Sequence, residues 1–190
     1  MLPTLRIPQK RLLPAAGSAL VLALLAPAAA LAGVQSMSLT VSGMTCPLCT
    51  RGVEESVKAL DEVGAVTADL ASGVVRVEAR EGKSLVIQQV KDRIFRAGFR
   101  IGGECELVAT GRFTLGGDRR ITLRIPGTSY AYQVLEGGEL LRLIKAHPGL
   151  RGDYIVGLRI HDHPNWKPPA VSITSFEFLP APLPRSAAGR

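Results

Sequence analysis

Hydrophobic and polar residues follow two different periods along the first half of the chain, and the order of these periods predicts its secondary structure. Apolar side chains recur every second residue in half-buried strands and every third or fourth residue in amphipathic helices. The predicted segments are strands at about residues 37–41, 66–70, 75–79 and 99–107 and helices at about 49–60 and 87–97. This order is a duplicated βαβ unit, which predicts a ferredoxin-like sandwich with two helices over a four-stranded antiparallel sheet.

Short polar stretches mark the ends of these segments. Ser72 and Gly73 separate the second and third strands and predict a hairpin turn. Ser84 stands shortly before the second helix, where we expect it to act as the N-cap, and Gly98 is expected to end that helix.

The two-residue period returns later in the chain and predicts a second, β-rich unit. Strands are expected at about residues 121–125, 130–134, 154–160 and 171–179, and a helix at 138–149. We therefore expect a domain at 33–107, a linker at 108–112, a small β-rich domain with one helix at 113–180, and a disordered tail at 181–190. The second unit resembles no family that we recognise, and the fold class of the chain is α+β.

The start of the chain has the composition of a secretory signal peptide. The first 14 residues carry three basic and no acidic side chains, and the apolar run at 15–32 ends in Ala30-Leu31-Ala32. We predict that residues 1–32 are a signal peptide cleaved after Ala32, so the protein is periplasmic or secreted. An uncleaved anchor is the alternative, since the run approaches the roughly 20 apolar residues that span a bilayer.

Export changes the interpretation of the charge. The formal net charge of the whole chain is +7, and it falls to +4 without the predicted signal peptide. Residues 33–107 have a net charge of −1 and residues 108–190 one of +5. A basic half can indicate a nucleic acid partner, but an exported protein seldom meets one. We expect no nucleic acid partner, and a membrane only through a partner or an uncleaved anchor.

Two of the three cysteines stand together in the stretch GMTCPLC at residues 43–49, directly before the first predicted helix. Free N–H groups and a partial positive charge at a helix N-terminus favour thiolate over thiol, so lowered pKa values are expected for Cys46 and Cys49. A thiolate pair suits soft ions and not Mg²⁺. Copper(I), mercury(II), zinc and cadmium remain, but a closed zinc site takes four ligands and the loop supplies two.

GMTCPLC, the helix after it and the later stretch AGF at residues 97–99 resemble the heavy-metal-associated domain family, over about residues 36–107. This family includes copper chaperones, the N-terminal modules of metal-exporting P-type ATPases and periplasmic mercury scavengers. The resemblance implies that Cys46 and Cys49 are metal ligands. It also implies that Gly43 permits a tight turn, that Met44 points inward to support the loop, and that Phe99 shields the site from water.

The resemblance further implies metal transfer without catalysis. The expected cargo is copper(I) or mercury(II), and the expected partner is a metal-transporting ATPase or another thiolate donor or acceptor. The PLC after Cys46 is similar to the mercury scavengers and AGF is similar to the copper ATPase modules, so the choice of metal stays open, with copper favoured by availability. Met44 and Phe99 have the alternative role of ordinary core residues.

The cysteine pair also has two alternative interpretations. The first is a structural disulfide, which an oxidising compartment permits. The second is a thiol-disulfide oxidoreductase of thioredoxin type, which also places CxxC at a helix N-terminus. The thioredoxin type normally has a tryptophan nearby and a larger sheet with parallel βαβ units. Here the only tryptophan, Trp166, is far away in the sequence, so this interpretation is the weaker one.

Three other residues with metal-binding chemistry remain. Cys105 is six residues beyond Phe99, about 20 Å along the last strand of the first domain, so we expect an ordinary thiol. His161 and His163 are two residues apart on a predicted strand and would project to one face, where they could share a metal. Surface polar residues at a strand end are the alternative for this pair.

Overall fold

The computed structural model describes residues 33–117, 119–161 and 168–180. The predicted signal peptide, His163, Trp166 and the predicted tail lie outside the described residues. No helix within the described ranges combines the length and the apolar composition that a membrane span requires.

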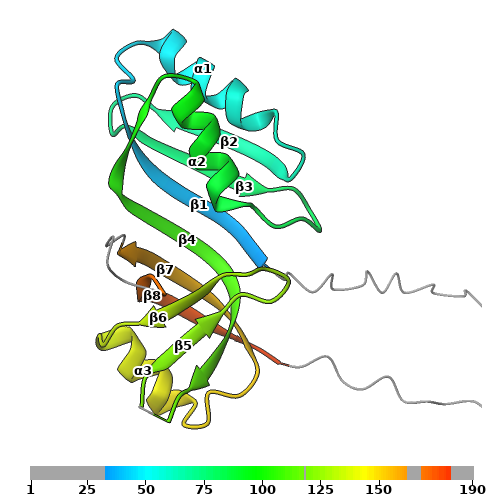
Figure 1. Cartoon of the computed structure of the whole chain (residues 1–190), viewed down its shortest axis with the longest axis vertical. Coiled ribbons are helices and arrows are strands. Elements are labelled where there is room, and N and C mark those ends of the chain that lie inside the picture. Colours follow the sequence, from blue (N-terminus) through cyan, green and yellow to red (C-terminus); the bar gives the residue numbers. More distant parts are fainter. Residues whose placement is uncertain (1–32, 118, 162–167, 181–190) are drawn as a thin grey trace, which may run out of the picture.

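The described residues form eight strands and three helices (Figure 1). In chain order they are β1 (Gly33–Ser42), α1 (Pro47–Lys58), β2 (Val63–Asp69), β3 (Val74–Ala79), α2 (Ile87–Arg96), β4 (Arg100–Leu115), β5 (Ile121–Arg124), β6 (Ala131–Val134), α3 (Gly138–Ala146), β7 (Asp153–His161) and β8 (Ala170–Leu179).

The first half has the predicted ferredoxin-like βαββαβ arrangement. Its strands lie in the order β2-β3-β1-β4, and each neighbouring pair is antiparallel. Met37, Leu39 and Val41 of β1 are buried and alternate with more exposed polar residues, so one face of the sheet is apolar. The buried residues of α1 and α2 belong to the same hydrophobic core. Burial of these two helical stripes on the sheet is the main source of stability.

The second half of the chain closes into a ring of strands. β4 pairs with β5, β5 with β6, β6 with β8, β8 with β7, and β7 pairs back with β4. Only the β6–β8 pair is parallel. Helix α3 packs on this ring through Leu140 and Leu143, which are buried. We call β1–β3, α1, α2 and the start of β4 the first lobe, and the ring with α3 the second lobe.

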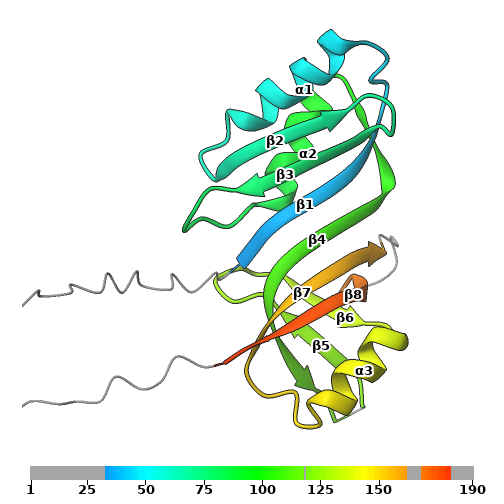
Figure 2. The same cartoon turned by 180° about the vertical axis from the view of Figure 1, so that it is seen from behind.

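The prediction of a linker at residues 108–112 is wrong. These residues lie inside β4, which runs through both lobes without a break (Figures 1 and 2). Ala109 is paired with Val34 of β1 on one side and with Val156 of β7 on the other. Because each residue of this segment is paired with β1, β5 or β7, the segment is held in extended form and does not act as a hinge.

A side-chain contact also joins the lobes. The hydroxyl of Tyr130, just before β6, accepts a hydrogen bond of 3.1 Å from the backbone N–H of Ile87, the first residue of α2. The rings of Tyr130 and Tyr132 are stacked with their centroids 6.3 Å apart. Burial raises the pKa of Tyr132, and the neighbouring Tyr130 and Cys105 raise it further. Tyr130 therefore links the second lobe to the start of α2.

The local signals of the first lobe were predicted with one error. Gly73, with a φ of 68°, forms the hairpin turn, and Gly98, with a φ of 91°, follows the last turn of α2. Ser84 is not the N-cap of α2: that position belongs to Val86, which makes no side-chain cap bond. Instead, the Ser84 hydroxyl accepts a hydrogen bond of 2.9 Å from the backbone N–H of Val34 in β1.

Candidate metal-binding site

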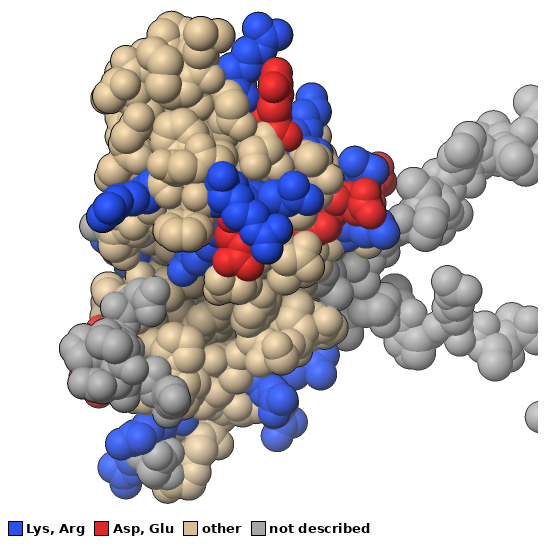
Figure 3. Space-filling view, turned by 45° about the horizontal axis from the view of Figure 1, so that its top comes forward, with Lys and Arg blue, Asp and Glu red and all other residues tan. Residues whose placement is uncertain are grey.

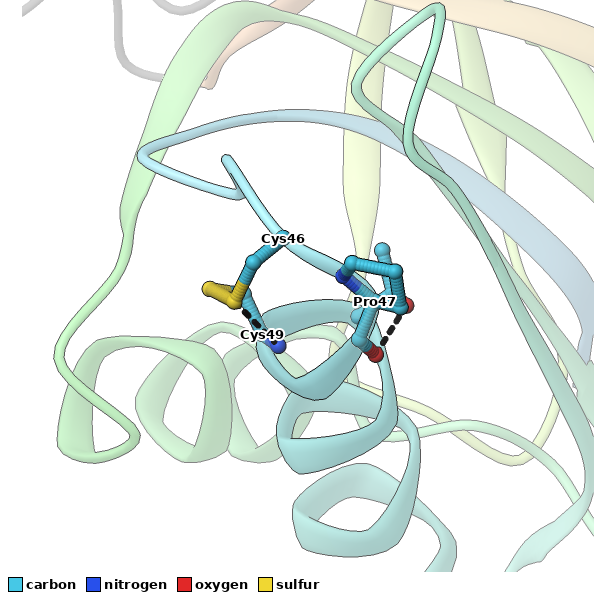
Figure 4. Close-up of a disulfide and its surroundings, with 4 residues drawn as sticks. Cys46, Pro47 and Cys49 are labelled. Atoms are coloured by element: carbon cyan, nitrogen blue, oxygen red, sulfur yellow. Dashed lines mark hydrogen bonds between the residues drawn. A yellow bond between two sulfur atoms is a disulfide. The ribbon is translucent and has the colours of Figure 1, made fainter.

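The candidate site lies in the loop between the end of β1 and the start of α1 (Figure 4). Gly43 has a φ of 98°, in the left-handed region that glycine tolerates best. Cys46 is the N-cap of α1, with extended backbone at φ −148° and ψ 157°, and Pro47 occupies the first helical turn. Proline suits this position because its missing N–H would have no helical partner and its φ fits a helix. α1 therefore starts two residues before the predicted range of 49–60, with Cys46 as its N-cap.

The two cysteines face each other across one helical turn. Their Cα atoms are 5.2 Å apart, and their sulfur atoms are joined as a disulfide (Figure 4). Both side chains are half-buried, and Cys49 packs against the core. This oxidised form corresponds to the disulfide alternative, and the role of the pair as metal ligands stays a prediction. The geometry brings the two sulfur atoms to one point at the surface.

The helix N-terminus acts directly on the first sulfur. The backbone N–H of Cys49 lies 3.2 Å from Sγ of Cys46, which accepts a hydrogen bond from it, and 2.9 Å from the carbonyl oxygen of Cys46. The first turn of α1 contains no acidic residue that would oppose a negative charge on this sulfur. A sulfur that accepts an N–H bond at the positive end of a helix is stabilised as a thiolate once the disulfide is reduced.

Met44 and Phe99 lie where the sequence places them beside the loop. Met44 is buried in the core of the first lobe. Phe99 is half-buried against the same core, and a Cβ atom on Gly43 would lie 3.6 Å from its Cδ1. These positions agree equally with simple packing and with the predicted supporting roles, so both roles remain predictions.

The end of α2 explains how Phe99 reaches the loop. The N–H of Phe99 donates to the carbonyl of Ile94 at 3.2 Å, and the N–H of Gly98 donates to that of Phe95 at 3.0 Å. This pair of bonds around a left-handed glycine is a Schellman motif. It turns the chain sharply out of α2 and directs the phenyl ring toward Gly43. The AGF stretch therefore has a structural role in this chain, because Gly98 permits the turn that brings Phe99 to the loop.

The loop that carries the cysteines has no charged side chain. Residues 43–50 contain no charged side chain, and Leu48 between the two cysteines is 78% exposed. The upper left of Figure 3, at the end of the molecule where this loop lies, shows an area without Lys, Arg, Asp or Glu. Leu48 is not among the site residues predicted from the sequence, although its place between two cysteines at the start of a helix is a signal that identifies it.

The other candidate ligands do not join this site. Cys105 is buried in β4 opposite Leu39, whereas the residue opposite the loop end of β1 is Arg100. His161 ends β7, where its Nε2 lies 2.8 Å from the hydroxyl of Ser172. Its predicted companion, His163, lies outside the described residues. Within the described part of the chain, no group of three or more His, Cys, Asp or Glu residues could hold a metal ion.

Comparison with known proteins gives a family for part of the chain. Residues 38–99 match the family model described as heavy-metal-associated domain. No curated protein matches the chain. The chain is similar to the CopZ metallochaperone, with 30% identity, coverage of 35% of this chain and 98% of that chain, and a TM-score of 0.33. It is also similar to a copper binding domain from HMA7, a P-type ATPase, with 24% identity, coverage of 40% of this chain and 95% of that chain, and a TM-score of 0.33. A third similar structure is oxidized MerP from Ralstonia metallidurans CH34, with 23% identity, coverage of 37% of this chain and 96% of that chain, and a TM-score of 0.33.

Proposed function

Because residues 38–99 form a heavy-metal-associated domain, we propose that this protein binds a soft metal ion between Cys46 and Cys49 and passes it to a partner. The observation that carries the proposal is the placement of both sulfur atoms at the N-terminus of α1, with an N–H group donated to the first of them. This arrangement stabilises two adjacent thiolates at the surface, and adjacent thiolates are ligands for soft ions.

The number of ligands favours copper(I) or mercury(II) as the cargo. Closed zinc sites use four protein ligands, but residues 43–50 supply only the two cysteines and no histidine or carboxylate. Copper(I) and mercury(II) are stable with two sulfur ligands in a nearly linear arrangement. Zinc and cadmium fit the same pair less well. The chain offers no charged residue in this loop that would choose between copper(I) and mercury(II).

Transfer proceeds by ligand exchange. An ion held by two thiolates at the surface has room for a third, so a partner thiolate can bind it before one of the original sulfurs leaves. The uncharged rim around Leu48 allows a partner to approach without displacing a tightly hydrated charge. The partner proposed is a metal-transporting ATPase or another thiolate protein. The chain itself performs no catalytic turnover in this scheme.

Reduction and pH control the site. The disulfide must gain two electrons and yield two thiolates before a metal can bind, so oxidation and metal binding exclude each other. Protons compete with the metal for the same sulfur atoms, and the affinity is therefore expected to fall as the pH is lowered. We place the protein in the periplasm or outside the cell, on the basis of the signal-like sequence at residues 1–32.

A second candidate function is thiol-disulfide exchange, and the disulfide between Cys46 and Cys49 favours it. The N-cap position of Cys46 would stabilise the thiolate that leaves when the disulfide is attacked. In this alternative the pair carries electrons and no metal, and the partner is another dithiol protein.

Metal titration separates the two functions. Reduced, oxygen-free protein is titrated with copper(I) and with mercury(II) in the presence of a competing chelator. We expect one ion per chain, and we expect Cys46→Ser to weaken binding at least about 100-fold, more than the loss of an outer contact to a metal site costs. Cys105→Ala is the matched control, because it also removes one thiol but lies far from the loop, and it should bind like the parent chain.

Absence of metal binding would favour the second function. If the reduced protein binds neither ion above the chelator, and instead reduces a model disulfide while Cys46 and Cys49 become oxidised to their own disulfide, the second function replaces the first. Equal loss of binding in Cys46→Ser and Cys105→Ala would contradict a site at the loop.

A further inference from the structure

The β2 strand is an open edge of the eight-stranded sheet. It stands at one end of the strand order, next to β3, whereas β7 at the other end pairs back with β4. Within the described ranges, β2 is therefore the strand that ends the sheet, and it lies on the outside of the first lobe beside α1 (Figure 2). The outward N–H and C=O groups of an edge strand can pair with a strand of another chain.

The residues of β2 give this edge little protection of their own. Residues 63–68 read VGAVTA, with no charged side chain and no proline. Edge strands are commonly protected by lysine, proline or an inward-pointing charge, and short uncharged segments without proline are prone to pair with copies of themselves. Val66 and Ala68 pack against the core, which holds the strand in place at the surface. Any protection of the edge therefore comes from other elements.

Two side chains from outside the strand bind backbone groups of β2. The N–H of Ala68 donates a hydrogen bond of 2.7 Å to Oε1 of Glu54 in α1, and not to a strand. The carbonyl of Val63 accepts a hydrogen bond of 3.3 Å from the guanidinium of Arg80. The register with β3 also shifts between Val63 and Ala65, and such bulges twist an edge away from a partner. One end of β2 is thus blocked by Arg80 and the bulge, and the other end by Glu54.

We propose that Glu54 keeps this chain from joining a second copy of itself through β2. In an antiparallel pair of two β2 strands, the N–H of Ala68 is a donor to the strand of the other copy. The Glu54 carboxylate already occupies this donor through a short charge-assisted bond, and it places a negative charge where the incoming carbonyl oxygen would lie. By two-fold symmetry, each copy blocks the other at the same residue. The proposal concerns the sheet edge alone and is independent of the metal site.

Sedimentation equilibrium tests the proposal with the purified protein, under reducing conditions that exclude disulfides between chains. We expect Glu54→Ala to associate at least about tenfold more tightly than the parent, because a charge-assisted hydrogen bond that competes with strand pairing is lost. Alanine is a strong helix former, so α1 should remain intact. Hydrogen exchange followed by NMR gives a second readout: the amide of Ala68 should exchange faster than in the parent when the variant is dilute, and more slowly when the variant is concentrated.

Three further variants locate the effect. Glu55→Ala removes the neighbouring carboxylate of α1, which pairs with Arg51 at the surface, and should leave association as in the parent. Glu54→Gln keeps an acceptor oxygen without the charge and should associate less tightly than Glu54→Ala. Adding Thr67→Lys to Glu54→Ala places a charge at an exposed position of β2 and should restore the behaviour of the parent. Equal association of the parent and Glu54→Ala, an equal gain in Glu55→Ala, or association that persists with Thr67→Lys would each overturn the proposal.

Discussion

Cys46 combines a structural role with a chemical one. As the N-cap of α1 its sulfur accepts the N–H of Cys49, a bond that Ser, Thr, Asp or Asn would make through oxygen in an ordinary helix. The residue that starts the helix is therefore also the residue that presents a thiolate. Gly43 makes this possible, because its left-handed backbone turns the chain from β1 into the loop.

We predict that Gly43→Ala destabilises the protein. A Cβ at this position meets only Phe99, at an ordinary contact distance of 3.6 Å, so the penalty comes from the φ of 98° and should be about 1–2 kcal/mol in the free energy of unfolding. Gly52→Ala is the matched control: it lies within α1 with nothing within 4 Å of a new Cβ and should stabilise the protein by about 0.5–1 kcal/mol. Urea denaturation measures both changes, and similar changes for the two variants would contradict the argument.

At the scale of the elements, the two helices of the first lobe begin in different ways. α1 is capped by its own N-cap sulfur, whereas α2 begins at Ile87 behind Val86, which has no capping side chain. The hydroxyl that accepts the N–H of Ile87 belongs to Tyr130, 43 residues away in the second lobe. The N-terminus of α2 therefore depends on tertiary structure, and the C-terminus of the same helix directs Phe99 to the loop.

We predict that Tyr130→Phe lowers the free energy of unfolding by about 1 kcal/mol, because it leaves a helix N–H without its partner. A second substitution, Val86→Ser, supplies an N-cap hydroxyl that reaches the N–H of Gln88 or Gln89 and not that of Ile87, so it should add about 1 kcal/mol to the stability in either background. Thermal or urea unfolding of the two single variants and the double variant measures both effects. A loss from Tyr130→Phe that disappears when residue 86 is serine would show that the two hydroxyls serve the same N–H.

At the scale of the whole molecule, β4 unites the lobes. Leu107 is paired with Met37 of β1 and also with Leu158 of β7, so the same backbone segment belongs both to the sheet of the first lobe and to the ring of the second. Ion pairs between Arg159 and Glu106 and between Arg112 and Asp153 join β7 to β4 at the surface, at 2.8 Å each, and contribute little by comparison.

This shared strand predicts cooperative unfolding of the two lobes. Backbone amides at residues 107–109 should exchange with solvent most slowly, and amides of α1 and β8 should become exposed together at one concentration of denaturant. Hydrogen exchange followed by mass spectrometry provides the measurement. Exposure of β8 at a clearly lower denaturant concentration than α1 would show that the lobes unfold independently.

Much of the first lobe and of the candidate site follows from local sequence. The spacing of apolar residues in Met37–Val41 and in α1 follows from the face that each strand or helix buries. Gly73 and Gly98 form turns because glycine adopts a positive φ without strain. The prediction that Ser84 caps α2 is wrong because the partner of Ser84 is distant in the sequence. Its hydroxyl suits a helix cap, but the N–H of Val34, 50 residues away, takes it. A residue with two suitable partners is not assigned by its neighbours alone.

By itself, the sequence determined the βαββαβ order, a helix that starts close to the cysteine pair and the placement of two cysteines about one turn apart, because these features depend on residues that are close along the chain. Only the tertiary structure decided that residues 108–112 are a shared strand, that the second lobe closes into a ring, and that residues of β6, α3 and the turn before β5 line one cavity. Strand pairing and cavity walls join residues far apart in sequence, and many pairings satisfy the same alternation of apolar and polar side chains.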